Sequence, residues 1–355
     1  MSRVALGVLL SMCLLVGCAQ HRPGLDIRTP TAGAPILVTV GCLSPVRSGK
    51  NILFLTDKGG WFSGSEWHLI EIDPFSNRLV ADIPIGGAAE WGSGSQIAVN
   101  EEGIWIPIGR EGFLRPPRIY KVDPETHQVT ASILVVAFEW SAEEHLRVRV
   151  VAGPAGVWAY IPGHDVVYRI DAKRNIIVGT NTMPFSIREL VYGEGALWAL
   201  DVRRIFSALG TGRNLFKINP NTLQVDARVE FDTEPLGFAA GAGSVWLPQW
   251  DPKAPVGVLS RVDPVNAKPR ESITLGPGRI GPETIGGIAA GEDAVFTFGA
   301  IASYLMYLTE IDPATNSVKR LYTLEAYLGG LPEVLVTSTD LWVCTWGGLW
   351  RLKRF

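Results

Sequence analysis

The sequence has few charged residues and few of the residue types that bind metals or carry covalent catalysis. Charged residues make up 19% of the chain, and it contains five histidines and four cysteines. There is no H-E-x-x-H motif and no pair of histidines at metal-ligand spacing. The formal net charge of −3, without a basic stripe carrying aromatics, argues against a nucleic-acid partner. From the sequence we assign no catalytic residue, no metal ligand and no cofactor.

Apolar residues are plentiful at 47%, which suffices for a large core and excludes global disorder. One apolar run, Val4–Val16, follows Arg3 at the start of the chain. Its length of about 13 residues is typical of a signal peptide and short for a membrane-spanning helix. We therefore predict a signal peptide at residues 1–17 and a flexible tether at residues 18–35.

The end of this run, Leu15-Val16-Gly17-Cys18, resembles the lipobox of bacterial lipoproteins. The resemblance implies cleavage before Cys18 and lipidation of its sulfur, which would anchor an extracytoplasmic protein to a membrane of the cell envelope. Ala19 stands where Asp often signals inner-membrane retention, so in a Gram-negative cell an outer-membrane anchor facing the periplasm is favoured. The alternative is an ordinary signal peptide that is cut elsewhere.

A repeat dominates the rest of the chain. Strand-like segments end in an acidic turn whose Asp or Asn is usually followed by Pro, a combination typical of β-turns. The turn residues are Asp73, Asp123, Asp171, Asn219, Asp263 and Asp312, at steps of 50, 48, 48, 44 and 49.

An aromatic residue follows each of these turns at a similar distance, after a short turn of small residues. These anchor residues are Trp105, Trp158, Trp198, Trp246, Phe296 and Trp342. Six copies in phase indicate radial repetition, with four short strands in each copy. The segment Asn51–Asp57 supplies a further copy, in which Phe54 precedes Trp105 by 51 residues.

We therefore predict an all-β, seven-bladed β-propeller at residues 36–355. The last blade, residues 332–355, contains three strands, and the N-terminal strand 36–41 is expected to join it and close the ring. Such closure removes an open sheet edge that would favour aggregation.

The repeat unit, an I-D-P-x-T-N turn followed by an apolar-G-x-G-x-x-W segment, resembles the YVTN/YncE-like propeller repeats and, in style, the virginiamycin B lyase-like propellers. The resemblance covers residues 36–355 and implies an extracytoplasmic seven-bladed propeller. It implies no common activity, because one fold hosts many functions.

Two cysteines remain in the propeller, Cys42 and Cys344, and both fall in the closing blade. A disulfide between them would tie the two ends of the ring together in an oxidising compartment. The alternative is a pair of free buried thiols.

The loops before the first strand and after the second strand of each blade are long and irregular, whereas the opposite turns are short. We call the two sides the long-loop face and the short-turn face. Binding residues concentrate in loops on rigid scaffolds, so the long-loop face is the expected binding face. Its candidate residues are Trp91, Trp140, His145 and Trp250.

A second candidate site comes from aligning the innermost strands on their anchors. The residue nine positions before each anchor is predicted to lie at the mouth of the central channel. These residues are Gln96, Arg149, Glu189, Gly237, Gly287 and Glu333. Charged groups at the end of a core strand need partners. The four polar ones form either a ligand site or a structural network that plugs the channel.

The sequence thus favours a lipid-anchored binding or scaffold module for an envelope protein or a small ligand. The alternative is a lyase or hydrolase with its site at the channel mouth. It would require His145 or His164 near a carboxylate such as Glu144, Glu189 or Glu333.

Overall fold

The computed structural model describes most of the predicted propeller and one short segment before it. The described residues are 26–28, 42–57, 67–85, 96–108, 117–135, 148–205, 208–251, 256–277, 285–302, 305–325, 332–345 and 348–354. All the regular secondary structure in these ranges is β-strand. The same ranges contain no helix long and apolar enough to span a membrane. The predicted signal peptide, Cys18 and the predicted closing strand 36–41 lie outside them.

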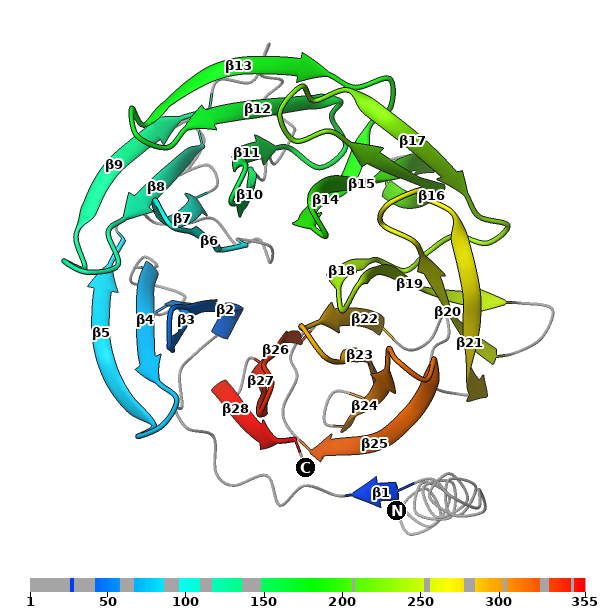
Figure 1. Ribbon diagram of the computed structural model, residues 1–355. Helices are drawn as coiled ribbons and strands as arrows, with labels where there is room; N and C mark the ends of the chain where they lie inside the picture. The colour runs from blue at the N-terminus through cyan, green and yellow to red at the C-terminus, as the bar shows by residue number, and fades with distance from the viewer. Residues whose placement is uncertain are drawn as a thin grey trace, which may run out of the picture.

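Seven antiparallel sheets follow one another around a ring, in chain order from blue to red in Figure 1. Blade 1 contains β2 (Cys42–Ser48), β3 (Asn51–Asp57), β4 (Trp67–Asp73) and β5 (Arg78–Pro84). Blade 2 contains β6 (Ala98–Asn100), β7 (Gly103–Ile108), β8 (Arg118–Val122) and β9 (Val129–Leu134). Blade 3 contains β10 (Arg149–Gly153), β11 (Gly156–Tyr160), β12 (Val166–Asp171) and β13 (Ile176–Thr182).

The second half of the ring repeats the pattern. Blade 4 contains β14 (Ile187–Gly193), β15 (Ala196–Ile205), β16 (Ala208–Ile218) and β17 (Val225–Glu230). Blade 5 contains β18 (Ala239–Gly241), β19 (Ser244–Asp251), β20 (Val256–Val262) and β21 (Pro269–Pro277). Blade 6 contains β22 (Ile285–Ala290), β23 (Val295–Ala302), β24 (Leu305–Asp312) and β25 (Ser317–Glu325). Blade 7 contains β26 (Glu333–Val336), β27 (Asp340–Thr345) and β28 (Gly348–Lys353).

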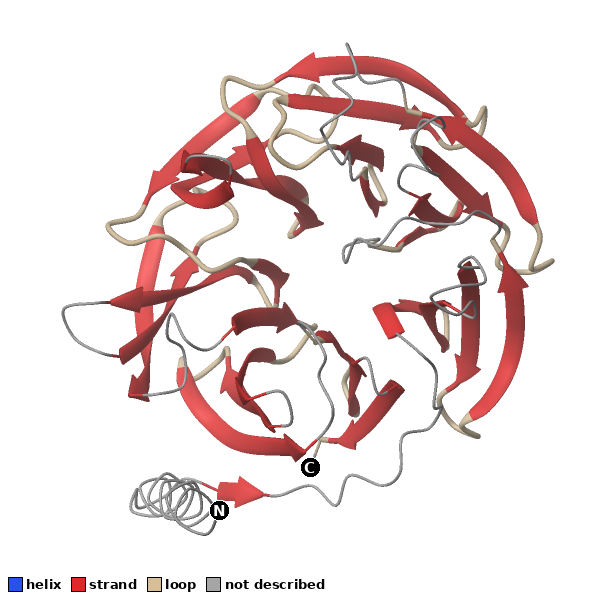
Figure 2. Ribbon diagram, turned by 180° about the vertical axis from the view of Figure 1, so that it is seen from behind, coloured by secondary structure: helices blue, strands red, loops and turns tan. Residues whose placement is uncertain are grey.

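The predicted all-β, seven-bladed propeller is confirmed. In each blade the first strand lies nearest the centre, and both views show these innermost strands around the ring axis (Figures 1 and 2). One short strand lies within the segment predicted to be a tether. β1 (Asp26–Arg28) pairs in parallel with β25 at the outer rim of blade 6.

The acidic turns take the conformation that their chemistry predicts. Asp123 Oδ1 accepts hydrogen bonds from the amides of Glu125 at 2.8 Å and Thr126 at 2.9 Å, and Asn219 Oδ1 does the same for the two equivalent amides. The residue four positions after each turn Asp or Asn has a positive φ. These residues are Asn77, His127, Asn175, Leu223, Ala267 and Asn316. Asn tolerates this left-handed conformation well, which explains its frequency there.

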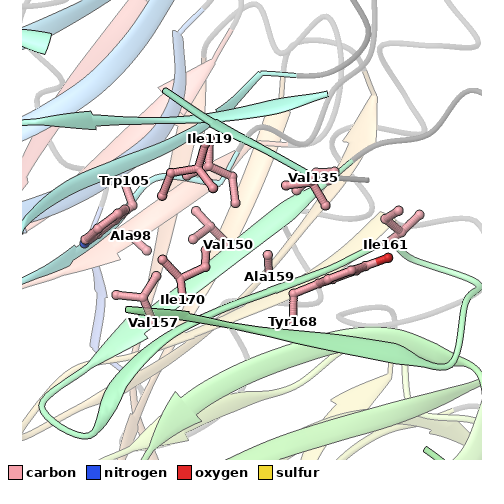
Figure 3. Packing of buried hydrophobic residues seen from close by; sticks show 12 residues of the cluster. Ala98, Trp105, Ile119, Val135, Val150, Val157, Ala159, Ile161, Tyr168 and Ile170 are labelled. Carbon is pink, nitrogen blue, oxygen red and sulfur yellow. The ribbon is translucent and has the colours of Figure 1, made fainter. Parts of the chain in front are cut away.

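The hydrophobic core lies between blades rather than within them. Seven clusters of buried residues are found in the described chain, and each joins two neighbouring blades. Figure 3 shows the cluster in which Trp105 and Ile119 of blade 2 meet Val150 and Tyr168 of blade 3. Stacking neighbours is what lets a four-stranded sheet bury its apolar faces.

The predicted anchors Trp105, Trp158, Trp198, Trp246, Phe296 and Trp342 are all buried on second strands. The expectation for blade 1 is wrong by one residue. Each anchor faces the third-strand residue two positions before its turn, and the residue opposite Glu71 is Leu53 rather than Phe54. Phe54 therefore points to the other face of the sheet, where it packs against Trp342 of blade 7.

That third-strand residue forms a contact, which we call a latch, with the following blade. In five blades it is a Lys or Arg that donates to a backbone carbonyl in the next blade's Asp-Pro-type turn. The latch donors are Lys121, Arg169, Lys217, Arg261 and Arg351. In four of these blades the cationic group also lies 4.7–5.9 Å from the centroid of its own anchor Trp, within cation–π range.

Blades 1 and 6 carry a carboxylate at this position, and the polarity of the latch is reversed. Glu71 Oε2 lies 2.8 Å from His127 Nε2 of blade 2, and Glu310 Oε1 lies 3.4 Å from Arg354 Nη2 at the end of blade 7. Each of the seven boundaries therefore carries a polar contact between the described residues of its two blades.

Candidate binding site at the channel mouth

The innermost strands place the predicted channel residues at one end of the ring. Arg149 and Glu333 are the first residues of β10 and β26, and Glu189 lies in β14. Gln96 precedes β6 by two residues and is half-buried. Since the chain enters each of these strands from the long-loop face, all four residues lie at that end of the ring.

Among these residues, Arg149 interacts electrostatically with both carboxylates. The carboxylates of Glu189 in blade 4 and Glu333 in blade 7 both act to raise the pKa of Arg149 in blade 3. Burial opposes them and Tyr160 supports them, and the net result is a raised pKa. Blades 3 and 7 are not neighbours in the ring, so the interaction between Arg149 and Glu333 runs across the ring axis. Arg188 precedes Glu189 on β14 and also interacts with it. We call Arg149, Arg188, Glu189 and Glu333 the channel-mouth cluster.

Burial dominates the electrostatics of Glu189. It raises the pKa of this carboxyl, and the opposing influence of Arg149 and Arg188 is too small to cancel it. The side chain reaches the neighbouring blade, because a Cβ at Gly237 would lie 3.7 Å from Glu189 Oε2, an ordinary van der Waals distance. Carboxyls whose pKa is shifted by burial and by neighbouring charges are frequent at functional sites.

Arg149 carries an unsatisfied donor. Its Nε is buried and has no hydrogen-bond acceptor among the described residues. Its strand partner Tyr160 is fully buried, and burial raises the pKa of the phenol despite the proximity of Arg149. Buried donors without acceptors are rare in folded proteins and often mark a site for water or ligand.

Alignment on the anchors missed Arg188 and Tyr160. Arg188 Nη2 donates to the carbonyl of Leu236 at 3.5 Å, and burial lowers the pKa of its guanidinium. The adjacent pair Arg188-Glu189 was the signal that could have revealed it. Tyr160 gave no such signal, because an aromatic on a second strand is ordinary core.

The other predicted site residues are not brought to this cluster. Trp91, Trp140 and His145 lie outside the described residues. Trp250 was expected in an irregular loop, but it lies on β19 opposite Gly257 of β20. Two of the segments after second strands, which were expected to be long irregular loops, are residues 202–213 and 249–256. They are largely extensions of strands β15, β16, β19 and β20, because hairpin pairing continues past the edge of the blade.

The predicted cysteine pair also lies at this end of the ring. The structure joins Cys42 to Cys344 by a disulfide, with Cα atoms 5.1 Å apart. Both cysteines were expected in the closing blade; Cys344 lies there on β27, but Cys42 begins β2, the innermost strand of blade 1. The bond links blades 1 and 7 across a sequence separation of 302.

Within the described chain, no group of three His, Cys, Asp or Glu residues is arranged to hold a metal ion. His164 lies in the turn between β11 and β12, where its carbonyl accepts a hydrogen bond from the amide of Ile187 at 2.7 Å. This bond ties blade 3 to the start of β14, the strand that carries Glu189. Glu144 and His145 lie outside the described residues.

Comparison with solved structures supports the architecture. The chain is similar to the WD40 domain of Neurospora crassa Pan2, with a TM-score of 0.58 and 8% identity over 88% of both chains. It is also similar to U3-55K, with a TM-score of 0.55 and 11% identity over 93% of this chain and 98% of that one. A chain of Kuenenia stuttgartiensis hydrazine synthase gives a TM-score of 0.57 and 11% identity over 94% of this chain and 99% of that one.

No family model matches the sequence, and no curated protein matches it significantly. At these low identities the structural likeness shows the fold alone, a seven-bladed propeller.

Proposed function

We propose that this protein is a lipid-anchored, extracytoplasmic binding module that takes a small charged ligand or a segment of an envelope protein at its channel mouth. The observation that carries the proposal is the convergence of Arg149, Glu189 and Glu333 from three blades around the ring axis. Burying charges there is costly without compensation, so a ligand that satisfies them would be held firmly.

The cluster favours a ligand that carries both signs of charge. Two arginines offer donors to a carboxylate or phosphate, and Arg149 has a spare buried Nε. Glu189 and Glu333 can accept from an ammonium group. A free amino acid or the end of a peptide presents both groups, and we propose this class of ligand.

The cellular location is proposed from the sequence. The lipobox-like segment ending at Cys18 supports a lipid anchor in the cell envelope, and the repeats support a YncE-like propeller. The bond between Cys42 and Cys344 agrees with an oxidising compartment, because structural disulfides are rare in reducing ones.

The first experiment is crosslinking and pull-down of the lipidated protein from intact cells, together with calorimetric titration of amino acids and dipeptides. The comparison is a variant with Gln96, Arg149, Glu189 and Glu333 all changed to Ala, which we call the cluster variant. The matched control is Arg228→Ala with Glu230→Ala, which removes an exposed ion pair of 3.0 Å on β17.

Binding of an amino acid or peptide that survives in the control and is lost in the cluster variant would support the proposal. An envelope partner that the cluster variant retains would move the site to the outer loops. Absence of any ligand or partner for the wild-type protein would contradict the proposal.

The enzyme alternative shares this site. The raised pKa of Glu189 supports it, since burial favours the protonated carboxyl, which is the form that can donate a proton as a general acid. Turnover of a bound peptide or glycan by the wild-type protein, abolished by Glu189→Gln, would favour the lyase or hydrolase over simple binding.

A further inference from the structure

The strand β1 gives the chain before the propeller a fixed place and a direction. Asp26, Ile27 and Arg28 pair in register with Arg320, Leu321 and Tyr322 of β25. Figure 1 shows the two strands side by side at the outer rim, far along the chain from each other. β25 is the outermost strand of blade 6, and β1 extends that sheet by one strand.

The parallel pairing determines the side from which the chain arrives. β25 begins after the turn at Asp312 on the short-turn face and runs toward the long-loop face. Because β1 runs the same way, its first residue lies nearer the short-turn face. The chain then continues to Cys42, which begins β2 at the long-loop end of the ring.

Pairing at β1 also shortens the reach of an anchor at Cys18. An extended chain spans at most ~3.3–3.6 Å per residue, so the eight steps from Cys18 to Asp26 cover about 26–29 Å. If the chain were free up to Cys42, its 24 steps would cover about 79–86 Å. The rim of blade 6 is therefore held close to whatever surface binds the anchor.

The same face carries the two most exposed large apolar side chains of the described residues. Phe75 is 84% exposed and Val265 is 83% exposed. They lie at equivalent places in the turns after Asp73 of blade 1 and Asp263 of blade 5. These turns stand on either side of blades 6 and 7. Apolar tips around the attachment point are suited to a lipid surface.

We propose that β1 orients the anchored propeller, with the short-turn edge of blade 6 toward the membrane and the channel mouth facing away from it. This inference rests on the lipid anchor of the proposed function. It gives the channel mouth free access to soluble ligands and places the membrane at the opposite face.

The pairing of β1 is tested first without any lipid. In the mature protein with Cys18→Ser, a second variant carries Asp26→Cys and Arg320→Cys at paired positions. Oxidation is expected to bond the two, with Asp26→Cys and Thr180→Cys on blade 3 as the matched control. A bond in neither protein, or equally in both, would overturn the inference while leaving the anchor itself untouched.

Orientation is then tested on vesicles of phosphatidylethanolamine and phosphatidylglycerol that contain a nitroxide-labelled lipid. A fluorophore is attached to Val265→Cys on the short-turn face or to Asp232→Cys, an exposed position at the long-loop end. We expect several-fold stronger quenching at position 265, and loss of the difference when Asp26, Ile27 and Arg28 are changed to Gly, Pro and Gly.

Equal quenching at the two positions, or a difference that persists without β1, would overturn the inference. Flotation separates this failure from failure of the proposed function. If the wild-type protein does not float with vesicles, both fall. If the wild-type protein floats and the Cys18→Ser variant does not, the lipid anchor is supported. A failed quenching test then rejects only the proposed orientation.

Discussion

The two ends of the blades share the same strand framework but differ in their side chains, which repeat from blade to blade at one end and vary at the other. At the short-turn edge one chemistry repeats, with an Asp or Asn in the turn and a cation beside the anchor Trp in most blades. At the channel mouth the equivalent positions carry Gln96, Arg149, Glu189, Glu333 or glycine. Repetition of side chains therefore accompanies structural contacts between neighbours, and its loss accompanies the candidate site.

The difference follows from what each end has to satisfy. A short-turn residue meets the same neighbour in every blade, so one solution serves at each boundary. Residues near the axis meet side chains from all blades at once, and seven identical charges there would repel one another. Charged residues at the axis therefore need opposite charges or neutral residues beside them, as Arg149, Glu189 and Gly237 illustrate.

The largest expected effect concerns the disulfide, which ties the long-loop end of the ring where repetition fails. Replacing Cys42 and Cys344 together by Ala should lower the free energy of unfolding by up to about 5 kcal/mol, because the bond closes a very long loop of the unfolded chain. Denaturant unfolding measures the loss. Thiol labelling of the unreduced, denatured protein should modify neither cysteine, and labelling of both would show that they are free.

The next effect tests whether all latches are equivalent. Arg351 holds Asp340 by two hydrogen bonds of 2.8 and 2.9 Å and also reaches Asn77 and the Pro74 carbonyl of blade 1. Arg351→Ala leaves the buried Asp340 with Thr339 and the more distant cation of Lys353, and should cost about 3 kcal/mol of unfolding free energy. Lys217→Ala, at an exposed latch, should cost about 1 kcal/mol.

Low pH should weaken the stabilisation that Arg351 gives through its contact with Asp340. Burial acts to raise the pKa of Asp340, but the hydrogen bonds from Arg351 and Thr339 outweigh it and the pKa is lowered. The stabilisation is thus present above the unfolded pKa of about 3.9 and is lost as pH falls through the folded value. The cost of Arg351→Ala should shrink in unfolding measured below pH 4, and an equal cost at all pH values would contradict this account.

At the channel mouth the pH dependence should have the opposite sign. Glu189 has a raised pKa through burial, so the folded state loses stability as pH rises above the unfolded value of about 4.3. Arg149→Gln removes a cation that lowers this pKa, and should cost about 2 kcal/mol more at pH 8 than at pH 4. Arg149→Lys keeps the charge and is the control. A deficit independent of pH would mean that Arg149 stabilises by packing alone.

Sequence reasoning succeeded where the chemistry repeats. The turns and anchors gave the number of blades, and the places of Arg149, Glu189 and Glu333 followed from counting back along equivalent strands. It failed where the repeat changes its polarity or length. Phe54 was taken as the anchor of blade 1 in place of Leu53, because an aromatic was expected at that position. Arg188 was missed because only one position per blade was considered. The pairing of β1 with β25 carries no local pattern, since a three-residue strand at an open edge needs only backbone hydrogen bonds.

The smallest expected effect returns to the short-turn edge, where Asn219 interrupts the acidic turns. The pKa values of Asp123 and Asp171 are lowered mainly by hydrogen bonds from the turn amides, and the Asn219 side chain accepts equivalent bonds without a charge. Asn219→Asp should therefore raise the melting temperature slightly at pH 7, because a carboxylate accepts stronger bonds than an amide. The gain should vanish as pH falls below about 4, since the lowered pKa stabilises only above that range. Asp123→Asn should show the reverse change with the same pH window. A gain that persists in acid would show that shape rather than charge distinguishes the two residues at these turns.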